Sequence, residues 1–389
     1  MGVFALAVLA LVAECVLRLR SARRFREQLD EDATSRSELH LPPYAWHPFL
    51  GQVHAANYVS ATCVTDEQGY RNRLPIAVQK PPGEIRVLLA GGSTAAGAGA
   101  PDGETILDSL QTAFGRARPE VRVINVAQSA FNSSQELAQT CLLLLDLEPD
   151  VLVLLDGRND FYFATRPDWR PHLTYRMTRF TQWYERTRGE SLRRASVAAT
   201  LADDVRRVSK ASPLLDSLAH LVIPAQVPKP GTPANAADLG SQVRRAALIY
   251  AENVRRVALL ALGSHCQLCV CLQPTLFETR KRLSDRERRA LAALRTGSLY
   301  YQENVTTHYP LFVSTADATL SRLAEDHQFI YRNCSGAFDD LGPEVEVFLD
   351  DGHLTPQGQA IIAKIIYEAI QPALTRDLKP RGGRGTPDP

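Results

Sequence analysis

Two segments far apart in the chain carry residue types that together perform acyl transfer. Ser93 follows the apolar run 85–90 after two glycines, where a strand is expected to meet a loop. Asp350 and His353 form an Asp-x-x-His pattern just before an amphipathic stretch. A serine hydroxyl becomes an effective nucleophile when a base takes its proton, and a carboxylate holds that base in the correct tautomer. The pattern predicts Ser93 as nucleophile, His353 as general base and acid, and Asp350 as the orienting carboxylate.

Asp351 is the alternative carboxylate for this triad. A spacing of three residues lets Asp350 turn back to Nδ1 of His353, which leaves Nε2 facing Ser93, so we expect Asp350. Taken separately, Ser93 is an ordinary turn serine and His353 an ordinary capping residue. The catalytic interpretation depends on finding them together with Asn159.

Acyl transfer also requires donors for the oxyanion that forms when the serine attacks a carbonyl. The backbone N–H of Ser93 is one candidate. Asn159 is the other, because its segment, 157–160, follows the apolar run 151–155 and its side chain carries an amide. No metal or organic cofactor is needed for this chemistry, and none is expected.

Four blocks in this order resemble the GDSL/SGNH hydrolases, whose blocks contribute a Ser, a Gly, an Asn and a His. They lie at 91–94, 125–130, 157–160 and 350–353, within a resemblance that spans roughly 65–375. The resemblance implies an α/β fold of the three-layer α/β/α, flavodoxin-like type, with a parallel sheet and a helical insertion. It also implies a serine esterase that works through an acyl-enzyme.

Two positions depart from the family pattern. Gly92 stands where the first block has Asp before the serine. Ala130 stands where the family has the glycine whose N–H is the third oxyanion donor, so the resemblance gives that role to Ala130. An alanine keeps the N–H, but a loop that requires positive φ would strain Ala130 or move the donor.

The glycines around Ser93 also fit two other motifs. Gly92 and Gly97 have the spacing of a phosphate-binding loop, but Ala98 occupies the lysine position, so nucleotide binding is not expected. The Gly-x-Ser pattern resembles the nucleophile elbow of α/β-hydrolases as well. The Asp-x-x-His spacing, with Asn159 in between, fits the SGNH pattern better.

Composition sets broad limits on partners. The chain has 389 residues, 45% hydrophobic and 22% charged, with a formal net charge of +1, so nothing favours a nucleic-acid partner. A small-molecule ester or an acylated glycan or lipid is compatible, and the oligomeric state is not indicated. Among the seven cysteines, Cys266, Cys269 and Cys271 cluster on an expected strand. Without a second ligand pair they favour buried thiols over a zinc site.

Apolar periodicity predicts alternating strands and helices between the blocks. The strands are expected at 85–90, 121–126, 151–155, 268–272 and 329–331. The helices are expected at 105–117, 134–145, 241–261, 284–294 and 317–325, with a last helix that begins at Thr355-Pro356. This rhythm predicts a parallel sheet covered by helices. An insertion at about 161–240 is interpreted either as a lid over the active face or as peripheral decoration.

The remaining divisions are an anchor with a basic flank at 1–26, a connector or N-terminal extension at 27–84, the hydrolase domain at 85–375 and a disordered tail at 376–389. Residues 3–17 are apolar except for Glu14 and are followed by arginines. A helix of that length reaches about 22 Å, short of the roughly 30 Å hydrocarbon core, so the arginines would have to extend it by snorkelling.

A membrane anchor is the preferred interpretation of residues 1–26, and an amphipathic or buried helix is the alternative. Arginines after the span favour a cytoplasmic body. Relatives with such a segment work outside the cytoplasm, and on that ground we expect an extracytoplasmic catalytic domain. Two functions remain as alternatives to an esterase: an O-acyltransferase acting on envelope glycans, and a catalytically idle module that binds glycans or lipids.

Overall fold

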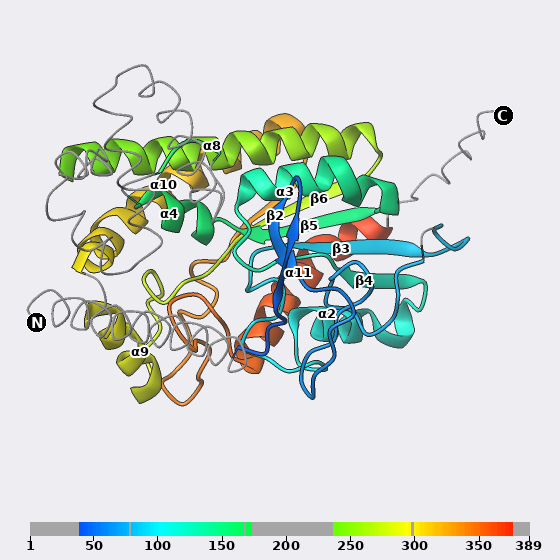
Figure 1. Cartoon of the computed structure of the whole chain (residues 1–389), viewed down its shortest axis with the longest axis horizontal. Coiled ribbons are helices and arrows are strands. Elements are labelled where there is room, and N and C mark those ends of the chain that lie inside the picture. The colour runs from blue at the N-terminus through cyan, green and yellow to red at the C-terminus, as the bar shows by residue number, and fades with distance from the viewer. Residues whose placement is uncertain (1–38, 78, 167–168, 173–235, 297–298, 376–389) are drawn as a thin grey trace, which may run out of the picture. The chain divides into compact units, whose positions relative to one another are not determined.

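The structure is a computed structural model that describes residues 39–77, 79–166, 169–172, 236–296 and 299–375 (Figure 1). Three segments with predictions lie outside the described residues: the anchor in 1–26, the tail 376–389 and most of the insertion, 173–235. No helix within the described ranges combines the length and apolarity needed to cross a bilayer. The described residues all belong to one compact unit.

Five parallel strands form the central sheet, in the order β4-β3-β5-β6-β7. Their bounds are β3 (Ile85–Gly91), β4 (Val121–Asn125), β5 (Val151–Asp156), β6 (Gln267–Leu272) and β7 (Ile330–Asn333). Relative to sequence order this is the 2-1-3-4-5 arrangement of flavodoxin-like folds. The predicted parallel α/β sheet is therefore confirmed, with all five predicted strands in place.

The central strands are buried on both faces, which explains why their sequences are continuously apolar. Every residue of β5 is buried, as are six of the seven in β3. Successive side chains alternate between two cores. Leu88 and Leu152 belong to one core, and Val87 and Val151 belong to the other.

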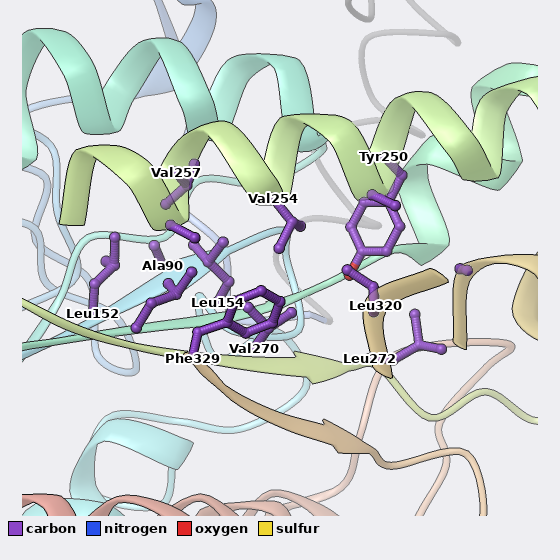
Figure 2. Close-up of a cluster of buried hydrophobic side chains, with 14 of the residues drawn as sticks. Ala90, Leu152, Leu154, Tyr250, Val254, Val257, Val270, Leu272, Leu320 and Phe329 are labelled. Atoms are coloured by element: carbon purple, nitrogen blue, oxygen red, sulfur yellow. The ribbon is translucent and has the colours of Figure 1, made fainter. Parts of the chain in front are cut away.

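The first core lies under α3 (Ser133–Gln139), α4 (Arg158–Ala164), α8 (Ala236–Gly263) and α10 (Leu299–His327). In Figure 2, Val254 and Val257 of α8 lie over Leu152 and Leu154 of the sheet, and Tyr250 lies farther along α8, beside Leu320. Helix α8 also packs on α3 and α4, the helices that follow the second and third blocks. Asn253 donates to Ser133 and Ser134 of α3, and Gln242, nearer the start of α8, donates to the Ala164 carbonyl at the end of α4.

The second core lies under α2 (Ile106–Phe114), α11 (Pro356–Thr375) and α9 (Asp285–Thr296). Phe114 of α2 meets Tyr367 of α11 edge to face, with ring centroids 5.0 Å apart. The predicted start of α11 is confirmed, because Thr355 Oγ1 accepts the Gly358 N–H at 3.2 Å and Pro356 is the first helical residue. The two cores make the predicted three layers.

Some helices differ from the predicted bounds. The stretch expected as a helix at 134–145 is α3 followed by a π-turn (Thr140–Leu144) and a 3₁₀ turn (Leu145–Leu147), and α2 ends in a 3₁₀ turn (Gly115–Ala117). Helix α10 is much longer than the expected 317–325, because it continues through Pro310. The expected insertion begins inside α4, whose Phe161 and Ala164 are buried core residues.

The sequence assigned 27–84 to a connector, but its described part packs into the same unit as the sheet. It begins with an antiparallel hairpin, β1 (Tyr44–His47) and β2 (Gly51–His54). His54 N donates to Gln128 Oε1 at 2.6 Å, and Gln135 Nε2 donates to Leu50 O at 2.8 Å. The hairpin is thus bonded to the loop and helix that follow β4.

Arg71 ties the same extension to the loop that follows Ser93. Its side chain is 2% exposed and donates to the carbonyls of Gly97 and Ala100, each at 2.8 Å. Its Nε donates to Asp102 Oδ1, also at 2.8 Å. Because a planar guanidinium offers five donors, one buried side chain organises the whole loop.

Replacing Arg71 by Met should lower the free energy of unfolding by about 3–5 kcal/mol, since Asp102 and the loop carbonyls would lose their buried partner. Urea titration followed by circular dichroism measures this difference. Arg256→Ala, which removes one partner of an exposed ion pair with Glu252, is the control and should change stability by under about 1 kcal/mol. Equal effects of the two substitutions would contradict the organising role of Arg71.

Candidate active site

Ser93, His353 and Asp350 form a continuous hydrogen-bonded chain. Ser93 Oγ lies 2.8 Å from His353 Nε2, and His353 Nδ1 lies 2.6 Å from Asp350 Oδ2. Asp350 Oδ1 also accepts the backbone N–H groups of Gly352 and His353, at 2.9 and 2.8 Å. Asp350 therefore turns back on its own loop, which fixes both the carboxylate and the imidazole that it orients.

The site lies at the carboxyl edge of the sheet, where strand order reverses between β3 and β5. Ser93 comes two residues after β3, and Asn159 comes three residues after β5. Open α/β sheets bind ligands at this topological switch point. His353 reaches the same edge from the loop before α11, because that helix packs on α2 behind the sheet.

Asp351 does not reach His353. Its carboxylate accepts from Arg158, through Nε at 3.0 Å and through Nη2. The Asp351 residue is only 5% exposed. The two carboxylates of the last block thus have different partners. Asp350 bonds to the imidazole of His353, and Asp351 bonds to the guanidinium of Arg158 in the third block.

The charge state of Asp350 follows from its neighbours. Burial by itself would raise its pKa, but the charge and hydrogen bond of His353, the Arg158 guanidinium and the Gly352 N–H together hold the pKa of Asp350 well below its usual range. Asp350 is consequently ionised throughout the pH range in which an imidazole acts as a base. It can stabilise a proton on His353 without taking that proton itself.

The proposed oxyanion donors come from two loops and from the first turn of α4. Asn159 Nδ2 donates to Phe131 O at 2.7 Å and would lie 2.7 Å from a Cβ placed on Gly92. The Asn159 amide therefore fills the space that a side chain at position 92 would need. Within the described part of the chain, no acceptor takes the N–H of Ser93 or of Ala130. The N–H of Ser93, the N–H of Ala130 and the second N–H of Asn159 remain for a ligand.

Ala130 has φ of 64°, in the left-handed region that favours glycine. His54 helps to hold the loop in this conformation. The His54 ring is buried, which lowers its pKa to about 3, with the charge of Arg71 as a second cause. Its neutral Nε2 lies 2.7 Å from Ser129 Oγ and accepts the Ser129 N–H at 3.1 Å.

Ala130→Gly should raise the free energy of unfolding by up to about 1 kcal/mol, because glycine adopts a positive φ without the Cβ penalty. Thermal and urea unfolding measure the change. Ala337→Gly, in a loop outside this site and not among the positive-φ positions, is the control and should not stabilise. A loss of stability in Ala130→Gly would show that the alanine methyl contributes more than the strain costs.

Three buried carboxyls lie behind the oxyanion loops, on α3, β5 and α4. Asp156 accepts the Tyr250 hydroxyl at 2.5 Å, and Asp160 accepts the hydroxyl and the N–H of Ser133 at 2.5 and 3.0 Å. The Glu136 oxygens receive no N–H or O–H from the described residues, and Asp156 lies within hydrogen-bonding reach of them. Burial and this neighbouring carboxyl both favour the protonated form of Glu136.

Burial raises the pKa of all three carboxyls. The pKa of Asp160 rises to about 7, and that of Glu136 rises well above its usual value through burial and the neighbouring Asp156 and Asp160. The folded state consequently binds more protons than the unfolded chain at mildly acidic pH. This contribution to stability is complete below the unfolded pKa values near 4 and is lost as pH rises through the folded ones.

The free energy of unfolding should therefore fall between pH 5 and pH 8 more steeply in the wild type than in Glu136→Gln. The glutamine is nearly isosteric, keeps a donor toward Asp156 and does not titrate. Urea titrations at several pH values measure the two slopes. Glu368→Gln, at an exposed position on α11, is the control and should keep the wild-type slope. Identical slopes in all three proteins would show that Glu136 does not bind a proton on folding.

Other side chains hold the site together and are not evident from the motifs. Gln273 and Thr94 both donate to the carbonyl of Gly352, the residue before His353. Gln273 directly follows β6, so its position at the carboxyl edge of a strand was the available signal. His54 gave no local signal, because its partner Ser129 is 75 residues away.

The clustered cysteines behave as buried strand residues. Cys269 and Cys271 are fully buried in β6, on the face covered by α2 and α11, and Cys266 is buried just before the strand. The two strand thiols lie 4.0 Å apart. Over the described ranges, no group of three His, Cys, Asp or Glu side chains is arranged to hold a metal ion.

No protein-family model and no curated protein matches the sequence. Among solved structures, the chain is similar to a GDSL-like lipase from Bacteroides thetaiotaomicron, with 14% identity over 76% of this chain and 92% of that one and a TM-score of 0.40. It is also similar to an acetyl xylan esterase, with 13% identity over 74% of this chain and 100% of that one and a TM-score of 0.40. A third similar structure is a catalytic mutant of an acetylxylan esterase from Geobacillus stearothermophilus, with 11% identity over 74% of this chain and 94% of that one and a TM-score of 0.39. Similarity at this level assigns no activity, so function has to be inferred from the site.

Proposed function

We propose that this protein is a serine esterase of the SGNH type. The observation that carries the proposal is the chain of hydrogen bonds from Ser93 Oγ through His353 to Asp350, at 2.8 and 2.6 Å, beside unpaired backbone donors. If Ser93 were only a turn residue and His353 only a helix cap, a hydrogen bond between them across 260 positions would not be expected. An ionised carboxylate behind the imidazole completes what nucleophilic activation requires.

The reaction begins when Ser93 Oγ attacks the carbonyl carbon of an ester while His353 Nε2 takes the hydroxyl proton. The resulting imidazolium is stabilised by Asp350 through Nδ1–H. Collapse of the tetrahedral intermediate expels the alcohol, which receives the proton from His353. Water then attacks the acyl-enzyme with His353 as base, and the free acid leaves as Ser93 regains its proton.

The oxyanion of each tetrahedral intermediate would accept from Ser93 N–H, Ala130 N–H and the Asn159 amide. The Phe131 carbonyl holds the Asn159 amide by one N–H, which directs the other. Removing one such donor typically raises the barrier by about 3 kcal/mol. Strained and buried backbone already holds these donors in place, so they need to move little during the reaction.

We extend the proposal to the substrate and its location on sequence grounds. A neutral acyl ester, either a small molecule or an acylated glycan or lipid, agrees with the near-zero net charge. The apolar stretch in 1–26 would tether the enzyme to a membrane with its site on the extracytoplasmic side. An acyl-enzyme that passes its acyl group to a sugar hydroxyl is the competing reaction, and product analysis separates the two.

Ser93→Ala should lower kcat/KM for p-nitrophenyl acetate, butyrate and octanoate by about 10⁴-fold or more, because the nucleophile is lost. The assay uses the full chain in detergent, with circular dichroism to confirm folding. Wild-type activity in Ser93→Ala would end the proposal. Free acid as the only product in the presence of a sugar acceptor supports hydrolysis, whereas an acylated sugar would identify a transferase.

The same assay distinguishes the two carboxylates. Asp350→Asn should reduce kcat by about 10⁴-fold, because the amide no longer stabilises the required tautomer and the imidazolium. Asp351→Asn is its matched control and keeps a hydrogen bond to Arg158, so we expect a loss of about tenfold or less. A larger loss in Asp351→Asn than in Asp350→Asn would reverse the assignment.

A further inference from the structure

The carbonyl of Gly352 lies at the point where the serine loop meets the histidine loop. It accepts the Thr94 hydroxyl at 2.9 Å and the Gln273 amide at 3.0 Å. The second N–H of the same amide is donated to Thr94 Oγ1 at 2.8 Å. Both lone pairs of the carbonyl are therefore used, and the three groups close a small ring of hydrogen bonds.

This ring joins the neighbours of the two reacting residues. Thr94 follows Ser93 in sequence, and Gly352 precedes His353. Gln273 belongs to neither loop. Its backbone N–H donates to Asp156 O at 2.9 Å and so continues the β5–β6 ladder, which anchors the side chain in the sheet itself. Gln273 and Thr94 are 5% and 1% exposed, so water does not compete for these bonds.

Arg158 also lies close to the Gly352 backbone. A Cβ at position 352 would lie 2.5 Å from both Cδ and Nε of Arg158, and 3.2 Å from Gln273 Nε2. An arginine from α4 and the glutamine that follows β6 thus both pack against the residue before His353. A larger residue at position 352 would require these side chains to shift.

We propose that Gln273 is a positioning residue, which holds His353 against Ser93 by bridging Thr94 and the carbonyl of Gly352. The proposal rests on the esterase mechanism above. A primary amide suits this position because one nitrogen offers two donors in a fixed plane, which neither a hydroxyl nor a carboxylate provides. During turnover His353 alternates between imidazole and imidazolium, and the bridge keeps its ring in register with Ser93 in both states.

Gln273→Met removes both donors and keeps the length of the side chain. Misplacement of a catalytic group by a fraction of an ångström is costly, so kcat should fall about tenfold to hundredfold, while KM for a small ester changes by less than about twofold. A residue that acted only through global stability would also lower the apparent kcat at constant KM, because less of the enzyme would be folded, so kcat is calculated per folded molecule. Thermal unfolding is therefore measured beside the kinetics.

Gln267→Met is the matched control. Gln267 is the first residue of β6, and its amide bonds to Leu268 O and Gln328 O at the other end of the strand. The same chemical change there should leave kcat unaltered. Thr94→Val removes the hydroxyl from the ring, and Thr94→Ser restores it. Thr94→Val should lower kcat, Thr94→Ser should not, and the double variant of Thr94→Val with Gln273→Met should be no worse than the poorer single one.

A second readout does not need turnover. The proton on His353 Nδ1, which is donated to Asp350 Oδ2 across 2.6 Å, should give a downfield NMR resonance that is absent from His353→Ala. In Gln273→Met this resonance should broaden or shift, whereas in Gln267→Met it should stay in place. This resonance reports the position of the imidazole and can be measured without knowing the substrate of the enzyme.

The outcomes separate the two proposals. A fall in kcat with constant KM and a disturbed resonance, confined to Gln273→Met and Thr94→Val, supports the positioning role. Wild-type kcat and an undisturbed resonance in Gln273→Met would overturn it, even in an active esterase. A disturbed resonance in a chain whose wild type shows no Ser93-dependent ester cleavage would uphold the positioning role and reject the esterase.

Discussion

The hydrogen bond between Ser93 Oγ and His353 Nε2 joins residues 260 positions apart, and packing in the rest of the described structure holds the two residues together. Closing so long a loop costs conformational entropy that one hydrogen bond, with a net contribution of about 1 kcal/mol, does not offset. The contact therefore depends on packing elsewhere. The parallel sheet fixes the position of the serine, and the seating of α11 beside α2 fixes that of the histidine loop.

Gln359 shows how the two halves are held together. From the first turn of α11 its amide donates to Ala98 O, in the loop after Ser93, at 3.0 Å, and its Oε1 accepts the Ile106 N–H at the start of α2, also at 3.0 Å. The side chain is fully buried. Together with Arg71 and Gln273, it shows that several carbonyls of the active-site loops accept from side chains of distant elements. Such loops can keep irregular conformations because their polar groups are nonetheless satisfied.

The sequence was informative where chemistry or periodicity is local. Apolar runs located the strands, and the order of the four blocks located the residues that the structure brings together at the sheet edge. It was uninformative where the partner is remote: nothing near Gln359 or His54 distinguishes them from surface polar residues, and Gln273 is marked only by its place directly after a strand. Helix α4 was missed because its seven residues follow directly on a glycine turn and show too few periods. The hairpin of the N-terminal extension was missed for a related reason, since its four-residue strands pair only with each other.

The two departures from the family pattern have a common physical origin in the oxyanion loops. A glycine at position 92 makes room for the Asn159 amide, which in turn is anchored by the carbonyl of Phe131, the residue after Ala130. Position 130 has a positive φ; the next carbonyl, that of Phe131, holds Asn159, and the N–H of Ala130 is the proposed oxyanion donor. An alanine pays a steric penalty of about 1–2 kcal/mol in that conformation. The buried bonds of His54 to Ser129 are made next to the strained residue, and the conformation persists because its surroundings leave no alternative.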